Sequence, residues 1–85
     1  MNKVIFVIRS RTDINILDGF LSRNSIRHQI INTPMSLRLS CGLSIITDET
    51  FLNEVRTIAA QSGVRINAIY RVISSEYTSK YFKLQ

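Results

Sequence analysis

The chain has 85 residues, enough for one domain with a modest core. Hydrophobic residues make up 45% and charged residues 20%, which is typical of a globular protein and excludes the disordered class. No apolar run approaches the roughly 20 residues that span a bilayer, and the N-terminal apolar stretch is too short for a secretory signal. We therefore expect a cytoplasmic protein with no membrane segment.

The net charge of +5 is compatible with an anionic partner such as a phosphate, a nucleic acid or an acidic protein face. The basic residues are scattered, however, and do not alternate with aromatic residues as they do in proteins that bind single strands. Nucleic acid is therefore not the partner that the linear sequence favours.

A single cysteine, Cys41, excludes an internal disulfide, a zinc knuckle and a CxxC redox pair. Together with the single histidine, His28, it does not complete a tetrahedral metal site within one chain. We expect no metal and no cofactor, and a free thiol at Cys41 in a reducing cytosol.

The first half of the chain predicts a strand, a helix and a second strand. Residues 3–8 are apolar without alternation, as in a central strand. Ser10 and Asp13 have capping-box spacing and predict a helix that runs to about Arg23, with Asn24-Ser25 as its stop because Asn tolerates the left-handed cap position. Residues 26–32 have two mixed faces, which indicates an edge strand, and Pro34 ends it.

The second half predicts a strand, a helix and a strand again. Residues 43–47 form the third strand, and Asp48 and Glu49 open a second helix that ends at Gly63. Residues 64–73 form the fourth strand. Residues 74–85 carry Tyr77 and Tyr81 at helical spacing and are expected to be a tail.

The order β-α-β-β-α-β predicts an α+β domain over residues 1–73, with residues 74–85 outside it. The simplest arrangement is the ferredoxin-like split βαβ fold, in which two helices cover one face of a four-stranded antiparallel sheet. The other face is then open to water, a partner or the tail.

This topology predicts a site around the segment from Thr33 to Leu43. Both the first and the second strand end where the first helix begins, so we expect Ser10, Arg11 and Thr12 to lie near Cys41. The turn at residues 63–65 should lie there as well. Gly42 is expected to let the backbone bend where a side chain would obstruct it. Helix N–H groups and guanidinium groups both favour a thiolate over a thiol.

Two interpretations of Cys41 stay open. Free cysteines are often small buried hydrophobes, whereas a thiol on a turn beside a helix start is a candidate nucleophile. His28 is the only candidate base, but it lies in mid-strand, away from the loop, so a Cys41–His28 dyad is not expected. A carrier needs only one exposed nucleophilic thiol, so we expect a protein that is not an enzyme by itself.

The other candidates also have two interpretations. Arg11 and Arg38 either steady an anionic cargo or are solvated loop residues. Ser10 and Thr12 are expected to be helix caps rather than catalytic residues. An apolar group in the central loop either docks a partner protein or packs within the hairpin; its members are Met35, Leu37 and Leu39.

Three motifs resemble a small bacterial family of unknown function, DUF3343, described as selenium/sulfur-carrier-like. They are Ser10-x-Thr12-Asp13, Thr33-Pro34 and Ser40-Cys41-Gly42-Leu43-Ser44-Ile45, and the match runs from Lys3 to about Val72. The resemblance implies a persulfide or selenopersulfide on Cys41 that passes to an acceptor protein, loaded by a donor of the cysteine desulfurase type. The family commonly has Arg directly after the proline, where this chain has Met35.

The alternative class is a non-catalytic module for protein or RNA interaction, in which Cys41 is structural. Dimerisation also stays open, because exposed sheet edges can pair across chains.

Overall fold

The computed structural model describes residues 2–34, 37, 42–74 and 79–85. Five strands are present in this part of the chain: β1 (Lys3–Ile8), β2 (His28–Asn32), β3 (Leu43–Asp48), β4 (Ala68–Ser74) and β5 (Ser79–Lys83). The helices are α1 (Arg11–Arg23) and α2 (Leu52–Ser62), and the short 3-10 turn η2 (Glu49–Phe51) leads into α2.

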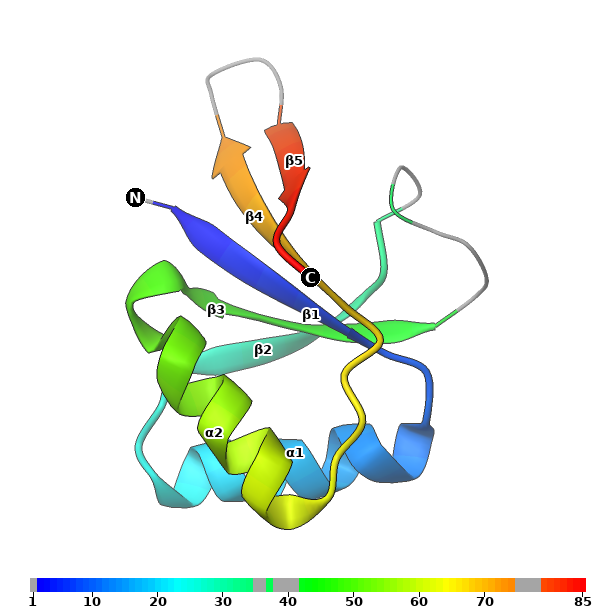
Figure 1. Ribbon diagram of the computed structural model, residues 1–85, viewed down its shortest axis with the longest axis vertical. Coiled ribbons are helices and arrows are strands. Elements are labelled where there is room, and N and C mark those ends of the chain that lie inside the picture. Colours follow the sequence, from blue (N-terminus) through cyan, green and yellow to red (C-terminus); the bar gives the residue numbers. More distant parts are fainter. Residues whose placement is uncertain (1, 35–36, 38–41, 75–78) are drawn as a thin grey trace.

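The strands form one sheet in the order β2-β3-β1-β4-β5, and every neighbouring pair is antiparallel (Figure 1). β1 lies in the middle, and β2 lies at an edge as the sequence predicts. The sheet has five strands, however, and the expectation of four is wrong. Residues 79–83 are not helical, because they pair along the otherwise free edge of β4 with Tyr81 opposite Val72.

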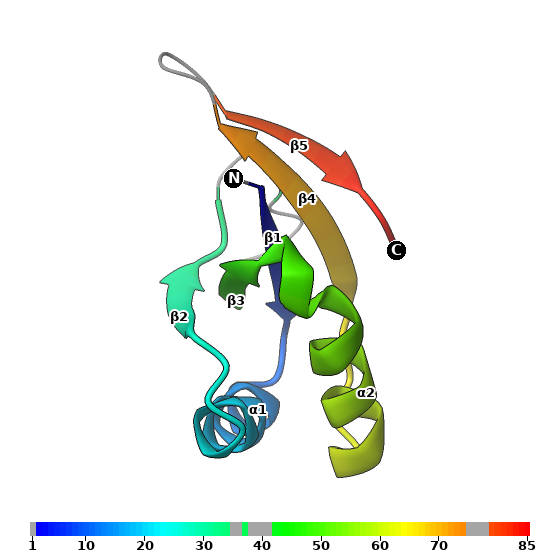
Figure 2. The same ribbon diagram turned by 90° about the vertical axis from the view of Figure 1, so that its left-hand side faces the viewer.

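Both helices lie on the same side of the sheet (Figure 2). β1 turns Val4, Phe6 and Ile8 toward them, and each of these side chains is fully buried. The helices contribute to the same core through Ile14, Leu17, Leu21, Val55 and Ala59. The α+β class with two helices is therefore confirmed, and its core is the layer between helices and sheet.

The N-terminus of α1 has the cap that the sequence predicts: Ser10 Oγ accepts a hydrogen bond from the Asp13 N–H at 3.2 Å. Its C-terminus differs in detail. Asn24 has φ −92°, and the left-handed residue is Ser25 with φ 57°. The Asn24 amide instead donates to the Phe20 carbonyl at 2.7 Å, which satisfies one of the last helix acceptors.

The start of the second helix also differs. Asp48 makes no side-chain cap, and the chain passes through η2 before α2 begins at Leu52. The two acidic side chains are used elsewhere, since Asp48 lies 3.9 Å from Lys3 Nζ and Glu49 pairs with Arg71. The C-terminus of α2 is as predicted, with Gly63 in the left-handed region at φ 75°.

The second and fourth strands begin later than predicted, because their first residues close the helices before them. The Ile26 N–H donates to the Leu21 carbonyl and the Val64 N–H to the Ala59 carbonyl, each at 2.9 Å. These residues are also buried in the core. The apolar run in each case therefore includes a helix end as well as a strand.

Candidate functional site

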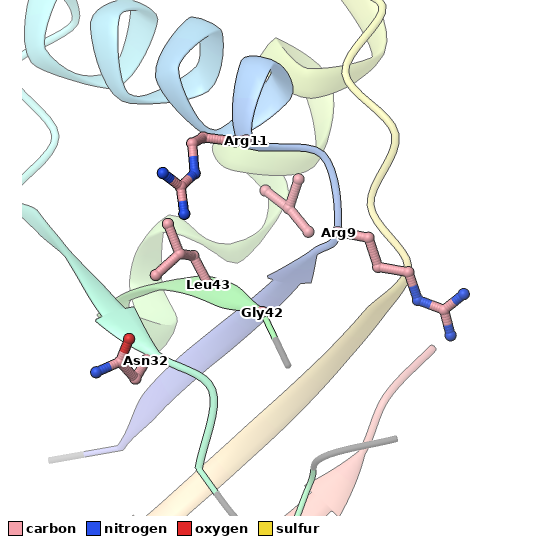
Figure 3. Close-up of a pocket in the computed structure, with 6 residues that line it drawn as sticks. Arg9, Arg11, Asn32, Gly42 and Leu43 are labelled. Atoms are coloured by element: carbon pink, nitrogen blue, oxygen red, sulfur yellow. The ribbon is translucent and has the colours of Figure 1, made fainter. Parts of the chain in front are cut away.

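Three chain segments meet at one end of the sheet. In the register of the strands Leu43 faces both Ile8 and Asn32, so β1 and β2 end where β3 begins. α1 starts directly after this end of β1 (Figure 3). The structure therefore confirms that the start of α1 and both ends of the central loop lie together, and Gly42, the neighbour of Cys41 in sequence, is among them.

A surface hollow of about 290 Å³ lies at this point. Its lining is Ile8, Arg9, Arg11, Asn32, Gly42 and Leu43. Figure 3 shows the guanidinium group of Arg11 reaching toward Leu43, whereas the side chain of Arg9 extends away from it. The hollow thus has one inward cation, Arg11, on the helix side and one polar side chain, Asn32, on the strand side.

The backbone of Gly42 is fixed but not crowded. Its carbonyl accepts the Thr33 N–H at 3.0 Å. A Cβ atom on Gly42 would come no closer than 3.9 Å to Thr33 Oγ1, an ordinary contact, and Gly42 does not have a positive φ. Among the described residues nothing obstructs a side chain at Gly42, so they give no support to the expectation that glycine is needed here.

Two buried hydroxyl groups hold the entrance and the exit of the central loop together. Thr33 Oγ1 and Ser44 Oγ are 2.7 Å apart, and Ser44 is fully buried. Because Thr33 precedes the loop and Ser44 follows it, this hydrogen bond and the Thr33–Gly42 backbone bond fix the distance between the two loop ends. The sequence motif contains both residues but did not indicate this contact.

The turn after α2 lies against the start of α1, while its predicted nearness to Cys41 concerns a residue outside the described ones. The Arg65 N–H donates to the carboxylate of Asp13 at 3.2 Å, in the first turn of α1. Close by, the Arg9 N–H donates to Asn67 Oδ1 at 2.9 Å. These bonds place the β1–α1 connection relative to the segment that enters β4.

The predicted site residues therefore have different outcomes. Arg11 and Gly42 line the hollow, while Ser10 acts as the helix cap and Thr12 is exposed. Leu37 is partly buried, and its N–H donates to the Pro34 carbonyl at 2.9 Å. The remaining predicted residues lie outside the described ones; they are Met35, Arg38, Leu39 and Cys41.

Sequence reasoning missed two residues of the hollow, Arg9 and Asn32. Each is a polar residue at the end of a predicted strand, and these two strands were expected to end at the same edge. That shared edge was the available signal. The same edge predicts Ser10, Arg11 and Thr12 at the site, and it equally indicates Arg9 and Asn32.

His28 lies at the opposite end of β2, where it pairs with Thr47. Its side chain is 8% exposed, and its ring nitrogens contact Asp18 Oδ1 at 2.6 Å and the Ile26 carbonyl at 2.7 Å. The contact with Asp18 ties β2 to α1, and the contact with Ile26 is made to the segment that leads into β2. The position of His28 agrees with the expectation that it does not serve the Cys41 loop.

Among the described residues, no helix combines the length and the apolar character that a bilayer crossing requires.

Comparisons with known proteins fix the family and the fold. No curated protein matches the chain. Among solved structures it is similar to a "functionally unknown protein from Pediococcus pentosaceus ATCC 25745", with 14% identity and a TM-score of 0.52. That alignment covers 96% of this chain and 80% of the other, and at this identity it shows a common fold alone. A family model described as "Putative Se/S carrier protein-like" matches residues 3–71. The chain therefore belongs to this Se/S carrier protein-like family.

Proposed function

We propose that the protein carries sulfur or selenium on Cys41, as a persulfide or a selenopersulfide, and passes it to an acceptor protein. The observation that carries the proposal is the hollow beside Gly42, which brings the Arg11 guanidinium and the start of α1 to the point where the Cys41 loop rejoins the sheet. Membership of the Se/S carrier protein-like family supports the same chemistry.

The transfer requires little from the protein. The Cys41 thiolate attacks the outer sulfur of a donor persulfide, the S–S bond of the donor breaks, and the donor thiolate leaves. An acceptor nucleophile later attacks the outer sulfur on Cys41, and the Cys41 thiolate is the leaving group. No net oxidation occurs in either step. Positive charge at Arg11 favours the thiolate both as the attacking and as the leaving group.

This chemistry needs no general base, which suits a domain whose single histidine is held by Asp18 and the Ile26 carbonyl. We therefore propose a carrier and not an enzyme. Its partners are a donor of the cysteine desulfurase type and a sulfur or selenium acceptor. In this role the central loop, with Met35, Leu37 and Leu39, is the segment that would contact those partners.

We also infer that β1 to β4 with the two helices form a ferredoxin-like split βαβ unit, to which β5 is added. The strand order β2-β3-β1-β4 and the position of both helices on one face support this inference.

Intact-mass spectrometry tests the carrier function. Wild type and Cys41→Ser are incubated with a cysteine desulfurase and cysteine in the absence of reductant. The expected result is a gain of one sulfur atom on the wild type alone, reversed by reductant. Absence of the adduct, with a Cys41 that alkylating reagents reach only after unfolding, would contradict the proposal. That result would favour the interaction module with a structural Cys41.

A further inference from the structure

The face of the sheet opposite the helices carries two tyrosines side by side. Because Phe6 faces the helices, its neighbour Ile5 faces the other way, and Ile5 pairs with Tyr70 of β4. Tyr70 pairs with Lys83 of β5, and Tyr81 lies two residues back along β5 on the same face. Such diagonal neighbours are roughly 7–8 Å apart, within reach of aromatic rings. Both tyrosines are partly exposed.

Two buried apolar residues neighbour the two tyrosines on the same face. Val72 pairs with Tyr81 and is 6% exposed, and Ile5 is 2% exposed, although neither helix covers this face. Ile5 belongs to the central strand β1 and Val72 to its neighbour β4. The two aromatic residues therefore neighbour a packed apolar part of the sheet, and we call this pair, Tyr70 and Tyr81, the platform.

Positive charge surrounds the platform. Lys83 faces Tyr70 directly, and Lys3 pairs with Val72 across β1 and β4. At the far side of the same face, Lys3 and Arg27 line a hollow of about 240 Å³ together with Asp48. Asp48 is the one acidic side chain there, 3.9 Å from Lys3 Nζ, so three cations face one carboxylate among the described residues of this surface.

We propose that this face binds single-stranded nucleic acid, with bases stacked on Tyr70 and Tyr81 and phosphates held by Lys83, Lys3 and Arg27. Aromatic rings on a basic surface fit planar bases joined by phosphates, because stacking is tolerant of sequence and the charge follows the backbone. An acidic peptide would need the cations but not the paired rings. The net charge of +5 favours the encounter.

The linear sequence concealed this arrangement. Tyr70 and Tyr81 are eleven residues apart, and the cations come from both ends of the chain and from the residue before β2. Only the antiparallel register of β1, β4 and β5 brings them onto one face. The expectation that nucleic acid is not a partner rested on the absence of a local pattern.

Neighbouring residues on β5 offer matched controls, because Lys80 and Phe82 face the helix side and Tyr81 and Lys83 face the opposite side. Binding of fluorescein-labelled oligouridylate and oligothymidylate is measured by anisotropy at increasing salt. We expect Tyr81→Leu to weaken binding at least about fivefold. Phe82→Leu and Tyr81→Phe should change it less than twofold. Lys83→Gln should reduce the slope of log affinity against log salt by about 0.7 relative to Lys80→Gln.

Several outcomes would overturn the proposal: no binding at low salt, equal losses for Tyr81→Leu and Phe82→Leu, or displacement by polyglutamate as effective as by unlabelled oligonucleotide. Binding of both oligonucleotides supports contacts to bases and phosphates alone, and binding of the RNA only adds a contact to the 2′-hydroxyl. Thermal unfolding confirms that each variant is folded. Cys41→Ser should bind as the wild type does, so the result is independent of sulfur loading.

Discussion

Arg11 is the cation that the fold sets beside the returning end of the Cys41 loop, with its guanidinium directed toward Leu43. We expect Arg11→Gln to slow alkylation of Cys41 at neutral pH by about two- to fivefold, because a nearby positive charge stabilises the thiolate and solvent screens part of the effect. Cys41 is the only cysteine, so the rate of iodoacetamide labelling reports on it alone. Arg56→Gln is the control, because Arg56 is an exposed residue of α2 and its replacement removes the same charge at another place. Equal labelling rates for the two variants would show that Arg11 does not stabilise the Cys41 thiolate.

The buried pair of Thr33 and Ser44 permits a second prediction for single residues. Ser44→Ala leaves the Thr33 hydroxyl buried without this partner, and such a loss costs about 1–3 kcal/mol of the free energy of unfolding. Replacing both residues, with Thr33→Val added, removes the unpaired group and should recover part of the loss. Urea denaturation of the wild type, both single variants and the double variant measures the coupling. Additive losses would show that the two hydroxyls do not stabilise each other.

The ends of the elements contain two glycines with opposite roles. Gly63 closes α2 at φ 75°, whereas Gly42 has no positive φ and, as far as the described residues go, room for a Cβ atom. We therefore expect Gly63→Ala to lower the free energy of unfolding by about 1 kcal/mol and Gly42→Ala to leave it nearly unchanged. Chemical denaturation of the wild type and the two variants measures the free energies of unfolding that test this expectation. A larger loss for Gly42→Ala would restore the original expectation that this position requires glycine.

The elements also show which features a single sequence can predict. Ser10 and Gly63 were correctly identified, because a cap and a left-handed stop depend on a few adjacent residues. β5 was missed because its structure comes from pairing with β4, and the helical spacing of Tyr77 and Tyr81 competed with that signal. Tyr77 lies outside the described residues. Arg9 and Asn32 were missed for a related reason, since only the register of the strands brings the two positions to one hollow.

At the scale of the whole molecule, stability is concentrated in the central strand. β1 is paired on both sides, by β3 and β4, and three of its side chains enter the core. β2 and β5 are edge strands, and most of the described residues of β5 are exposed. Amides of β1 are therefore released only by opening that approaches global unfolding, whereas those of the edge strands are released by local fraying.

We therefore expect amide hydrogen exchange to be slowest in β1, intermediate in β3 and β4, and fastest in β2 and β5. The His28–Asp18 contact ties β2 to α1. In the described part of the chain, β5 is held by its pairing with β4, by the contact between the Ser74 and Ser79 hydroxyls and by the bonds between Ile69 and the last two residues. β2 should consequently exchange more slowly than β5. His28→Ala should remove that difference without altering protection in β1, and uniform protection across the sheet would contradict a core centred on β1. Exchange measured by NMR with and without this substitution provides both tests.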